Sequence, residues 1–132
     1  MKDIIIDLSS TSKAIAIKLL EHILNQPGDL YITYGELSKR CGSVIPPHHL
    51  GSFLGEISEM CKENGLPLLS AIVVNGETGY PGTGFYEYFF PGQPYSAWET
   101  IRNREHQSIK SSKREWKALL GCLVGNNPYL YF

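Results

Sequence analysis

The chain has 132 residues, of which 42% are hydrophobic and 19% charged, and its net charge is −1. This length and composition predict one folded domain with a single core and exclude a disordered chain. No run approaches the roughly 18 apolar residues of a membrane span, and the N-terminus MKDIIIDLSS lacks the long apolar stretch of a signal peptide. We therefore expect a cytoplasmic protein that does not bind membranes.

The charges are distributed unevenly along the chain. Residues 1–100 carry a balance of −5, whereas residues 101–132 carry +4. The basic segment at 102–117 is open to two interpretations, a surface that contacts phosphate or one solvated helix face.

The cysteines do not indicate a disulfide framework or a metal site. Cys41, Cys61 and Cys122 are widely spaced, odd in number and without a C-x-x-C pair. We expect free, mostly buried thiols, no metal and no small-molecule cofactor.

The first third of the chain predicts two helices joined by a short extended piece. Residues 9–26 have apolar side chains at the spacing of one helical face, with serines that can cap the helix N-terminus. After an extended segment at 30–32, the sequence TYGE forms a capping box, in which Thr33 and Glu36 start a short helix over about 34–41. Gly42 is a suitable stop.

The middle of the chain predicts a turn, a longer helix and a hairpin. The two prolines of SVIPPH exclude a helix there, and a second helix is expected over about 48–63, with Gly51 and Gly55 on one face allowing close packing. Residues 70–75 predict a strand and 75–79 a turn, after which 85–90 return as an extended arm.

The last third predicts a helical extension over about 96–120, as one helix or two, with SIKSSK as the possible interruption. The apolar and aromatic end at 126–132 is expected to fold back onto the core. The element order favours an α+β fold: a single domain with a winged helix-turn-helix-like core, an N-terminal helix and a C-terminal helical extension.

Three stretches in the same order resemble a known family. ITYGELSKRCG, HHLGSFLGEI and LPLLSAIVVNGETGYPGTGF are similar to the DNA-binding domain of alkylguanine-DNA alkyltransferases and of the non-enzymatic alkyltransferase-like proteins, over residues about 30–90. The third stretch also resembles a small bacterial group of uncharacterised domains associated with restriction and defence genes.

The resemblance implies roles for individual residues. Tyr34 matches the tyrosine that crowds the target phosphate and helps to rotate a base out of the duplex, and His48 falls where the family has an arginine that fills the vacated stack. Gly51 matches the glycine of the recognition helix. Ser70 stands where the family has its alkyl-accepting cysteine, and Ala71 and Ile72 replace the adjacent His-Arg. Because the nucleophile and its base are both missing, we expect no enzyme activity.

The sequence thus favours a non-catalytic DNA-binding module that recognises modified or flipped bases, in DNA repair or in restriction and defence. Its candidate DNA-binding residues, taken from the helix pair, are Tyr34, Ser38, Lys39, Arg40, His48, His49 and Ser52. The N-terminus of the second helix, where His48 and His49 stand, is a position that favours bound anions.

A protein-binding module of the same fold is the alternative, as an immunity or inhibitor-type protein or a subunit of a defence complex. The acidic first hundred residues favour it, and Glu56, Glu59 and Glu63 oppose deep insertion of their helix between phosphates. Aromatic residues are dense over 80–95, and one sheet face cannot bury all of them. The candidate partner-binding residues are Glu56, Glu59, Tyr86 and Tyr88.

Overall fold

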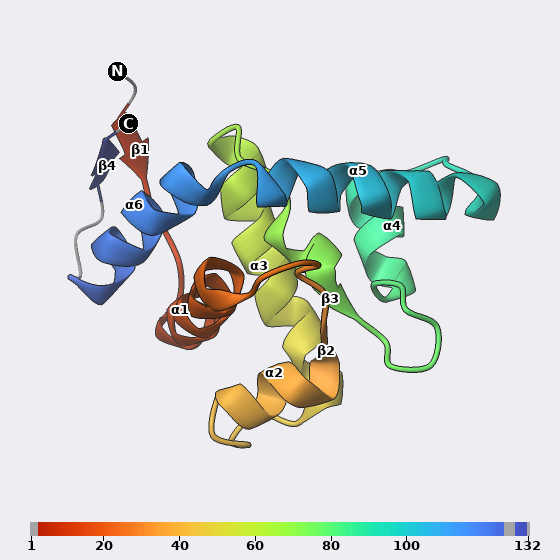
Figure 1. The fold of residues 1–132 in the computed structure, drawn as a ribbon, viewed down its shortest axis with the longest axis horizontal. Coiled ribbons are helices and arrows are strands. Elements are labelled where there is room, and N and C mark those ends of the chain that lie inside the picture. The colour runs from red at the N-terminus through yellow and green to blue at the C-terminus, as the bar shows by residue number, and fades with distance from the viewer. Residues whose placement is uncertain (1–2, 126–128, 132) are drawn as a thin grey trace.

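A computed structural model describes residues 3–125 and 129–131, with side chains described from 6 to 125. It is mostly helical (Figure 1). The α-helices are α1 (Ser10–Asn25), α2 (Tyr34–Arg40), α3 (Leu50–Glu63), α4 (Thr83–Phe89), α5 (Trp98–Lys110) and α6 (Lys113–Val124). Short 3-10 turns are η1 (Pro47–His49), η2 (Leu69–Ile72) and η3 (Tyr95–Ala97), and the strands are β1 (Asp3–Ile5), β2 (Ile32–Thr33), β3 (Val73–Val74) and β4 (Tyr129–Tyr131).

Helix α3 runs through the middle of the molecule, with α1 on one side, α4 on the other and α5 and α6 across one end (Figure 1). Its buried face carries Leu50, Leu54, Ile57 and Cys61, which join the core built by α1, η2, α5 and α6. Burying this stripe at about 25 cal/mol per Å² of apolar surface holds α3 in place. None of the described helices combines the length and apolarity needed to cross a membrane.

Two small strand pairs connect distant parts of the chain. Strands β1 and β4 pair antiparallel and bring the two ends of the chain together. Strands β2 and β3 pair in parallel, with Ile32 opposite Val73 and Thr33 opposite Val74. Since α2 begins at the residue after β2, this second pair places the start of α2 beside the segment 69–74.

Several predicted boundaries are confirmed. Helix α1 begins after Ser9, and Thr33 caps α2, since its hydroxyl accepts a hydrogen bond from the Glu36 amide at 3.1 Å. The break between α5 and α6 falls at 111–112, inside SIKSSK. The second helix of the pair begins at Leu50 and not at His48, because Pro47 to His49 form a 3-10 turn first.

The predicted hairpin, and with it the wing of a winged helix, is wrong. Of the residues expected to form the first strand, only Val73 and Val74 are hydrogen-bonded to another strand. The expected extended arm forms the helix α4. The aromatic residues of α4 recur at helical spacing, so that the Phe85 ring packs 5.8 Å from Phe89 and 5.7 Å from Phe90. Residues four apart share one face of a helix, and this packing outweighs the β-propensity of the aromatic residues.

The prediction for residues 126–132 lies partly outside the described residues, which exclude 126–128 and 132. Residues 129–131 form β4, whose backbone pairs with β1.

One side chain of α3 anchors the start of α1. The Glu56 carboxylate accepts hydrogen bonds from the Ser9 amide at 2.7 Å, from the Ser9 hydroxyl at 3.1 Å and from the Ser12 hydroxyl. These bonds, with the Ser12 hydroxyl first, hold the pKa of the Glu56 carboxyl below its ordinary value. A carboxylate at a helix N-terminus also meets the positive end of the helix dipole.

We expect Glu56→Gln to lower the free energy of unfolding by about 1 kcal/mol at neutral pH, the usual value of a helix cap. Because the folded-state pKa is depressed, the wild-type advantage is complete above the unfolded-state pKa of about 4.3 and is lost as the pH falls through the folded-state value. Urea unfolding of both proteins at neutral and acidic pH measures this. A difference that stays constant down to pH values below the folded-state pKa would contradict the role given to Glu56.

Candidate functional site

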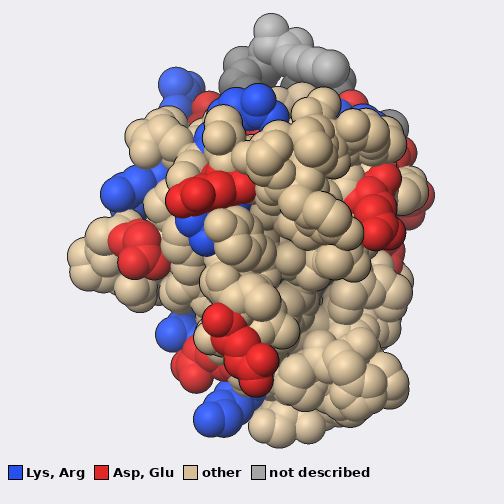
Figure 2. Space-filling model, turned by 90° about the vertical axis from the view of Figure 1, so that its right-hand side faces the viewer, with Lys and Arg blue, Asp and Glu red and all other residues tan. Residues whose placement is uncertain are grey.

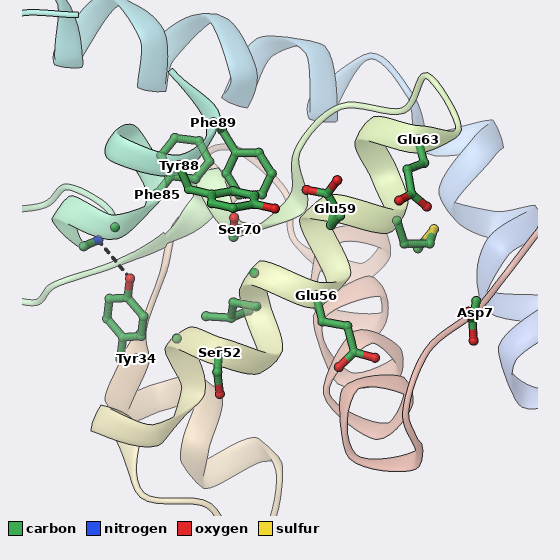
Figure 3. A pocket seen from close by; sticks show the side chains of 16 residues that line it. Asp7, Tyr34, Ser52, Glu56, Glu59, Glu63, Ser70, Phe85, Tyr88 and Phe89 are labelled. Carbon is green, nitrogen blue, oxygen red and sulfur yellow. Dashed lines mark hydrogen bonds between the residues drawn. The ribbon is translucent and has the colours of Figure 1, made fainter. Parts of the chain in front are cut away.

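A pocket of about 660 Å³ lies between α3 and α4 (Figure 3). Its lining comes from four regions: the segment before α1, the start of α2, one face of α3, and the segment from η2 to α4. The lining residues are Asp7, Tyr34, Gly51, Ser52, Leu54, Gly55, Glu56, Glu59, Met60, Glu63, Ser70, Gly82, Gly84, Phe85, Tyr88 and Phe89. Such a volume is within the usual range for small-molecule sites.

Tyr34 lies at one end of the pocket, where its hydroxyl accepts a hydrogen bond of 2.9 Å from the Gly82 amide (Figure 3). Its side chain is partly buried, and this burial raises the pKa of the phenol. The bond joins the first residue of α2 to the loop before α4, and the partly exposed Tyr34 is not sealed in the core.

Ser70 lines the same pocket and is fixed from below by α3. Its amide donates to the Ser58 hydroxyl at 3.0 Å, and the two hydroxyl oxygens lie 2.6 Å apart. The Ser70 side chain is only 6% exposed. A serine whose hydrogen-bonding partner is a second serine has no base to activate it.

Two glycines of α3 leave room in the pocket. Close packing was expected at Gly51 and Gly55, but a Cβ atom at either position would meet nothing within 4 Å. That prediction is wrong: the space beside both glycines is open, and no other backbone packs against them.

The other end of the pocket is acidic and aromatic. Glu59 and Glu63 extend from α3 toward this end, and the Tyr88 ring of α4 lies across it (Figure 3). A hydrogen bond with Glu59 is the main cause that raises the pKa of Tyr88, followed by the charge of the same carboxylate. The Glu59 Oε2 atom is buried and accepts no hydrogen bond from the described residues.

The loop from 75 to 82, whose last residue lines the pocket, is held by hydrogen bonds within the loop and from α5. The Asn75 carbonyl accepts from the Gly79 amide at 2.8 Å, and the Asn75 side chain accepts from the Glu77 amide at 2.8 Å. Arg102 of α5 then donates to the Gly79 carbonyl at 2.7 Å, with its guanidinium 4.6 Å from the Tyr80 ring. The predicted turn at 75–79 is confirmed.

The predicted DNA-binding residues divide into three groups. Tyr34 and Ser52 line the pocket, and Lys39, His48 and His49 are exposed on the helix pair. Arg40 is also exposed and forms an ion pair of 3.5 Å with Glu36. Ser38 is wrong as a DNA contact, since it is 4% exposed and its hydroxyl donates to the Ile45 carbonyl at 2.6 Å.

The predicted partner-binding residues separate as well. Glu59 lies in the pocket and Tyr88 is 63% exposed beside it. Glu56 lines the pocket, but its carboxylate is occupied by the start of α1. Tyr86 is wrong as a surface residue, because it is 1% exposed and its ring stacks on Trp98 at a centroid distance of 4.1 Å.

Sequence reasoning missed the α4 side of the pocket. Phe85 and Phe89 are predicted on an extended arm, and Gly82, Gly84 and Met60 are not among the predicted site residues. The 85/89 spacing was the available signal, since residues four apart share one face of a helix.

The surface around this region is not strongly basic. Figure 2, which views the molecule from the right-hand side of Figure 1, shows a largely uncharged face with acidic and basic side chains interspersed toward one side of it. Within the part of the chain that the figure colours, the basic groups do not form a continuous band across this face.

Comparisons with protein-family models, curated proteins and solved structures found no match for this chain. The described residues contain no group of three or more His, Cys, Asp or Glu side chains placed to hold a metal ion.

We expect Arg102→Ala to lower the free energy of unfolding by about 1–2 kcal/mol, because it removes a hydrogen bond and the contacts with two tyrosine rings. Arg104→Ala is the comparison and should cost less than about 0.5 kcal/mol, since Arg104 is largely exposed and its ring contact, with Phe90, is longer at 5.8 Å. Urea unfolding measures both. Equal losses of unfolding free energy in the two variants would contradict the stabilising role given to the Arg102 contacts.

Proposed function

We propose that this protein is a non-catalytic DNA-binding module that accepts a base, turned out of the helix stack, into the pocket between α3 and α4. The observation that carries the proposal is the meeting of Tyr34, Ser52 and Ser70 in one cavity. These residues come from three separate stretches of the sequence, and the resemblance to alkyltransferases gives Tyr34 and Ser70 positions at a flipped base.

The geometry supports this function at the level of the helix pair. The exposed His48 and His49 precede α3, and Ser52 in its first turn is among the residues that line the pocket. A DNA strand lying along this end of α3 would pass the Tyr34 end of the pocket, where a base could enter. Unstacking a mismatched or damaged base costs the least free energy, so such bases are the expected ligands.

The charge distribution supports base recognition more than backbone binding. Lys39 and Arg40 are the basic residues of α2, and the pocket side of α3 carries carboxylates. Two phosphate contacts give a slope of only about −2 in a plot of log affinity against log salt concentration. We therefore expect weak binding to a perfect duplex and tighter binding where a base is available to the pocket.

Absence of catalysis is part of the proposal and is supported by the thiols as well as by Ser70. Burial raises the pKa of Cys61 to about 12, and it raises the pKa of Cys41 and of Cys122. A thiol with a raised pKa is a poor nucleophile at neutral pH, because the thiolate is the reactive form.

A protein-binding module is the second candidate, and the exposed Tyr88 favours it. Tyrosine is enriched at protein interfaces, and here it borders an acidic pocket end that a basic side chain would complement.

We expect Gly55→Leu to fill the pocket and raise the Kd for a duplex with one unpaired base by about tenfold or more, with little change for a perfect duplex. The fold should survive, because leucine is a better helix former than glycine and its Cβ has space. Gly121→Leu is the control, a helical glycine of α6 with equally open surroundings. Fluorescence anisotropy with labelled duplexes measures the two variants, and identical losses in both would remove the pocket from DNA binding.

We expect Lys39→Ala to weaken binding to all duplexes about equally and to reduce the salt slope by about one. The control is Lys62→Ala, which removes an exposed lysine at the opposite end of α3. The test is the same anisotropy titration at several salt concentrations. A slope reduced by Lys62→Ala and not by Lys39→Ala would place the DNA strand elsewhere on the molecule.

A further inference from the structure

The charge on the pocket wall has one sign. Its lining includes the four acidic residues Asp7, Glu56, Glu59 and Glu63 and no lysine or arginine. The Glu56 carboxylate is already bound by Ser9 and Ser12, so Glu59 and Glu63 are the acidic side chains of α3 left to face a ligand.

Glu59 carries an unmet hydrogen-bonding requirement. Its Oε2 atom is buried and has no donor among the described residues. A buried acceptor without a donor destabilises the protein, and a ligand N–H group placed there would remove that penalty. Tyr88 lines this end of the pocket and is 63% exposed, so the Glu59 carboxylate lies beside an aromatic side chain that a ligand can also contact.

The wall that α4 contributes is aromatic. Phe85, Tyr88 and Phe89 face the pocket from α4, opposite the carboxylates of α3 (Figure 3). Aromatic faces attract cations as well as stacking on planar rings. Aromatic rings on one side and carboxylates on the other therefore complement a ligand that is both planar and positively charged.

Resting on the proposed function, we propose that the pocket selects a cationic base, one alkylated on a ring nitrogen, over neutral bases of the same size. In DNA, 1-methyladenine and 3-methylcytosine are such bases. A methyl group on a ring nitrogen of this kind leaves the base positively charged near neutral pH, and the exocyclic amino group remains to donate toward Glu59. A basic peptide would also offer a positive charge. Lys39, His48 and His49 on the same helix pair instead favour DNA, a polyanion, that contains a positively charged base.

The test compares positional isomers of a methylated base, one of which is cationic near neutral pH and the other neutral. Labelled oligonucleotides carry, at one site, 1-methyladenine or N6-methyladenine, and 3-methylcytosine or 5-methylcytosine, and anisotropy gives the Kd of each at neutral pH and fixed salt. We expect the cationic isomer to bind on the order of tenfold more tightly in each pair. Glu59→Gln should reduce this ratio to about twofold or less.

The control is Glu87→Gln, which removes the same charge from an exposed position on α4 outside the pocket. It should leave the ratio unchanged, although both variants gain affinity for DNA in general. Glu63→Gln, at an exposed position of the pocket wall, lowers the ratio in the same direction and serves if Glu59→Gln does not fold.

Each outcome decides between the two proposals. Equal Kd values for the isomers, in a protein whose binding Gly55→Leu still weakens, overturn the preference for a cation and keep the base pocket. A ratio that persists in Glu59→Gln and Glu63→Gln also overturns it. If no oligonucleotide binds and an arginine-containing peptide binds the wild type but not Glu59→Gln, both proposals fail and the pocket is a protein-docking site.

Discussion

The two-residue parallel pairing of β2 with β3 determines where the pocket forms. It aligns Ile32 and Thr33 with Val73 and Val74, although α2 and α3 intervene in the chain. Thr33 then caps α2, so that Tyr34 must begin its helix beside the segment that holds Ser70. The bond from Gly82 to Tyr34 completes the arrangement by fastening the start of α4 to the same point. Two pairs of strand residues, the Thr33 cap and the hydrogen bond from Gly82 thus bring three distant stretches of the chain together at one cavity.

Much of the helical framework could be predicted because its signals are local. Each signal acts on its own turn of backbone. Ser9 caps α1, Thr33 caps α2, and glycines with φ of +81° and +70° follow α2 and α3. The hairpin prediction failed because its evidence was the β-propensity of single aromatic residues, while the deciding interaction was the packing of Phe85 on Phe89 and Phe90. The predictions of Ser38 and Tyr86 as surface residues failed for a similar reason. Nothing near them in sequence indicates that their hydroxyls donate hydrogen bonds to the backbone carbonyls of Ile45 and Trp98.

The acidic residues of α3 have a different meaning in the structure from the one suggested by their sequence. As a set they oppose binding to phosphate, and the net charge of residues 1–100 points the same way. Glu56 anchors the start of α1, whereas Glu59 and Glu63 line a cavity that also has an aromatic wall from α4. Carboxylates inside a pocket interact electrostatically with the bound base. The phosphates lie farther away, because the sugar separates them from the base. The same charges can therefore weaken backbone binding and favour a particular base.

The central claim is that a nucleobase enters the pocket at its Tyr34 end, and backbone amide NMR on addition of a duplex with one unpaired base tests it most directly. The account predicts that the largest chemical-shift changes fall on Tyr34, Ser52, Ser70 and Gly82, and that they are absent in Gly55→Leu. Changes confined to the exposed basic residues of α6, Lys113, Arg114 and Lys117, would contradict it, because binding would then use the opposite, sequence-independent surface.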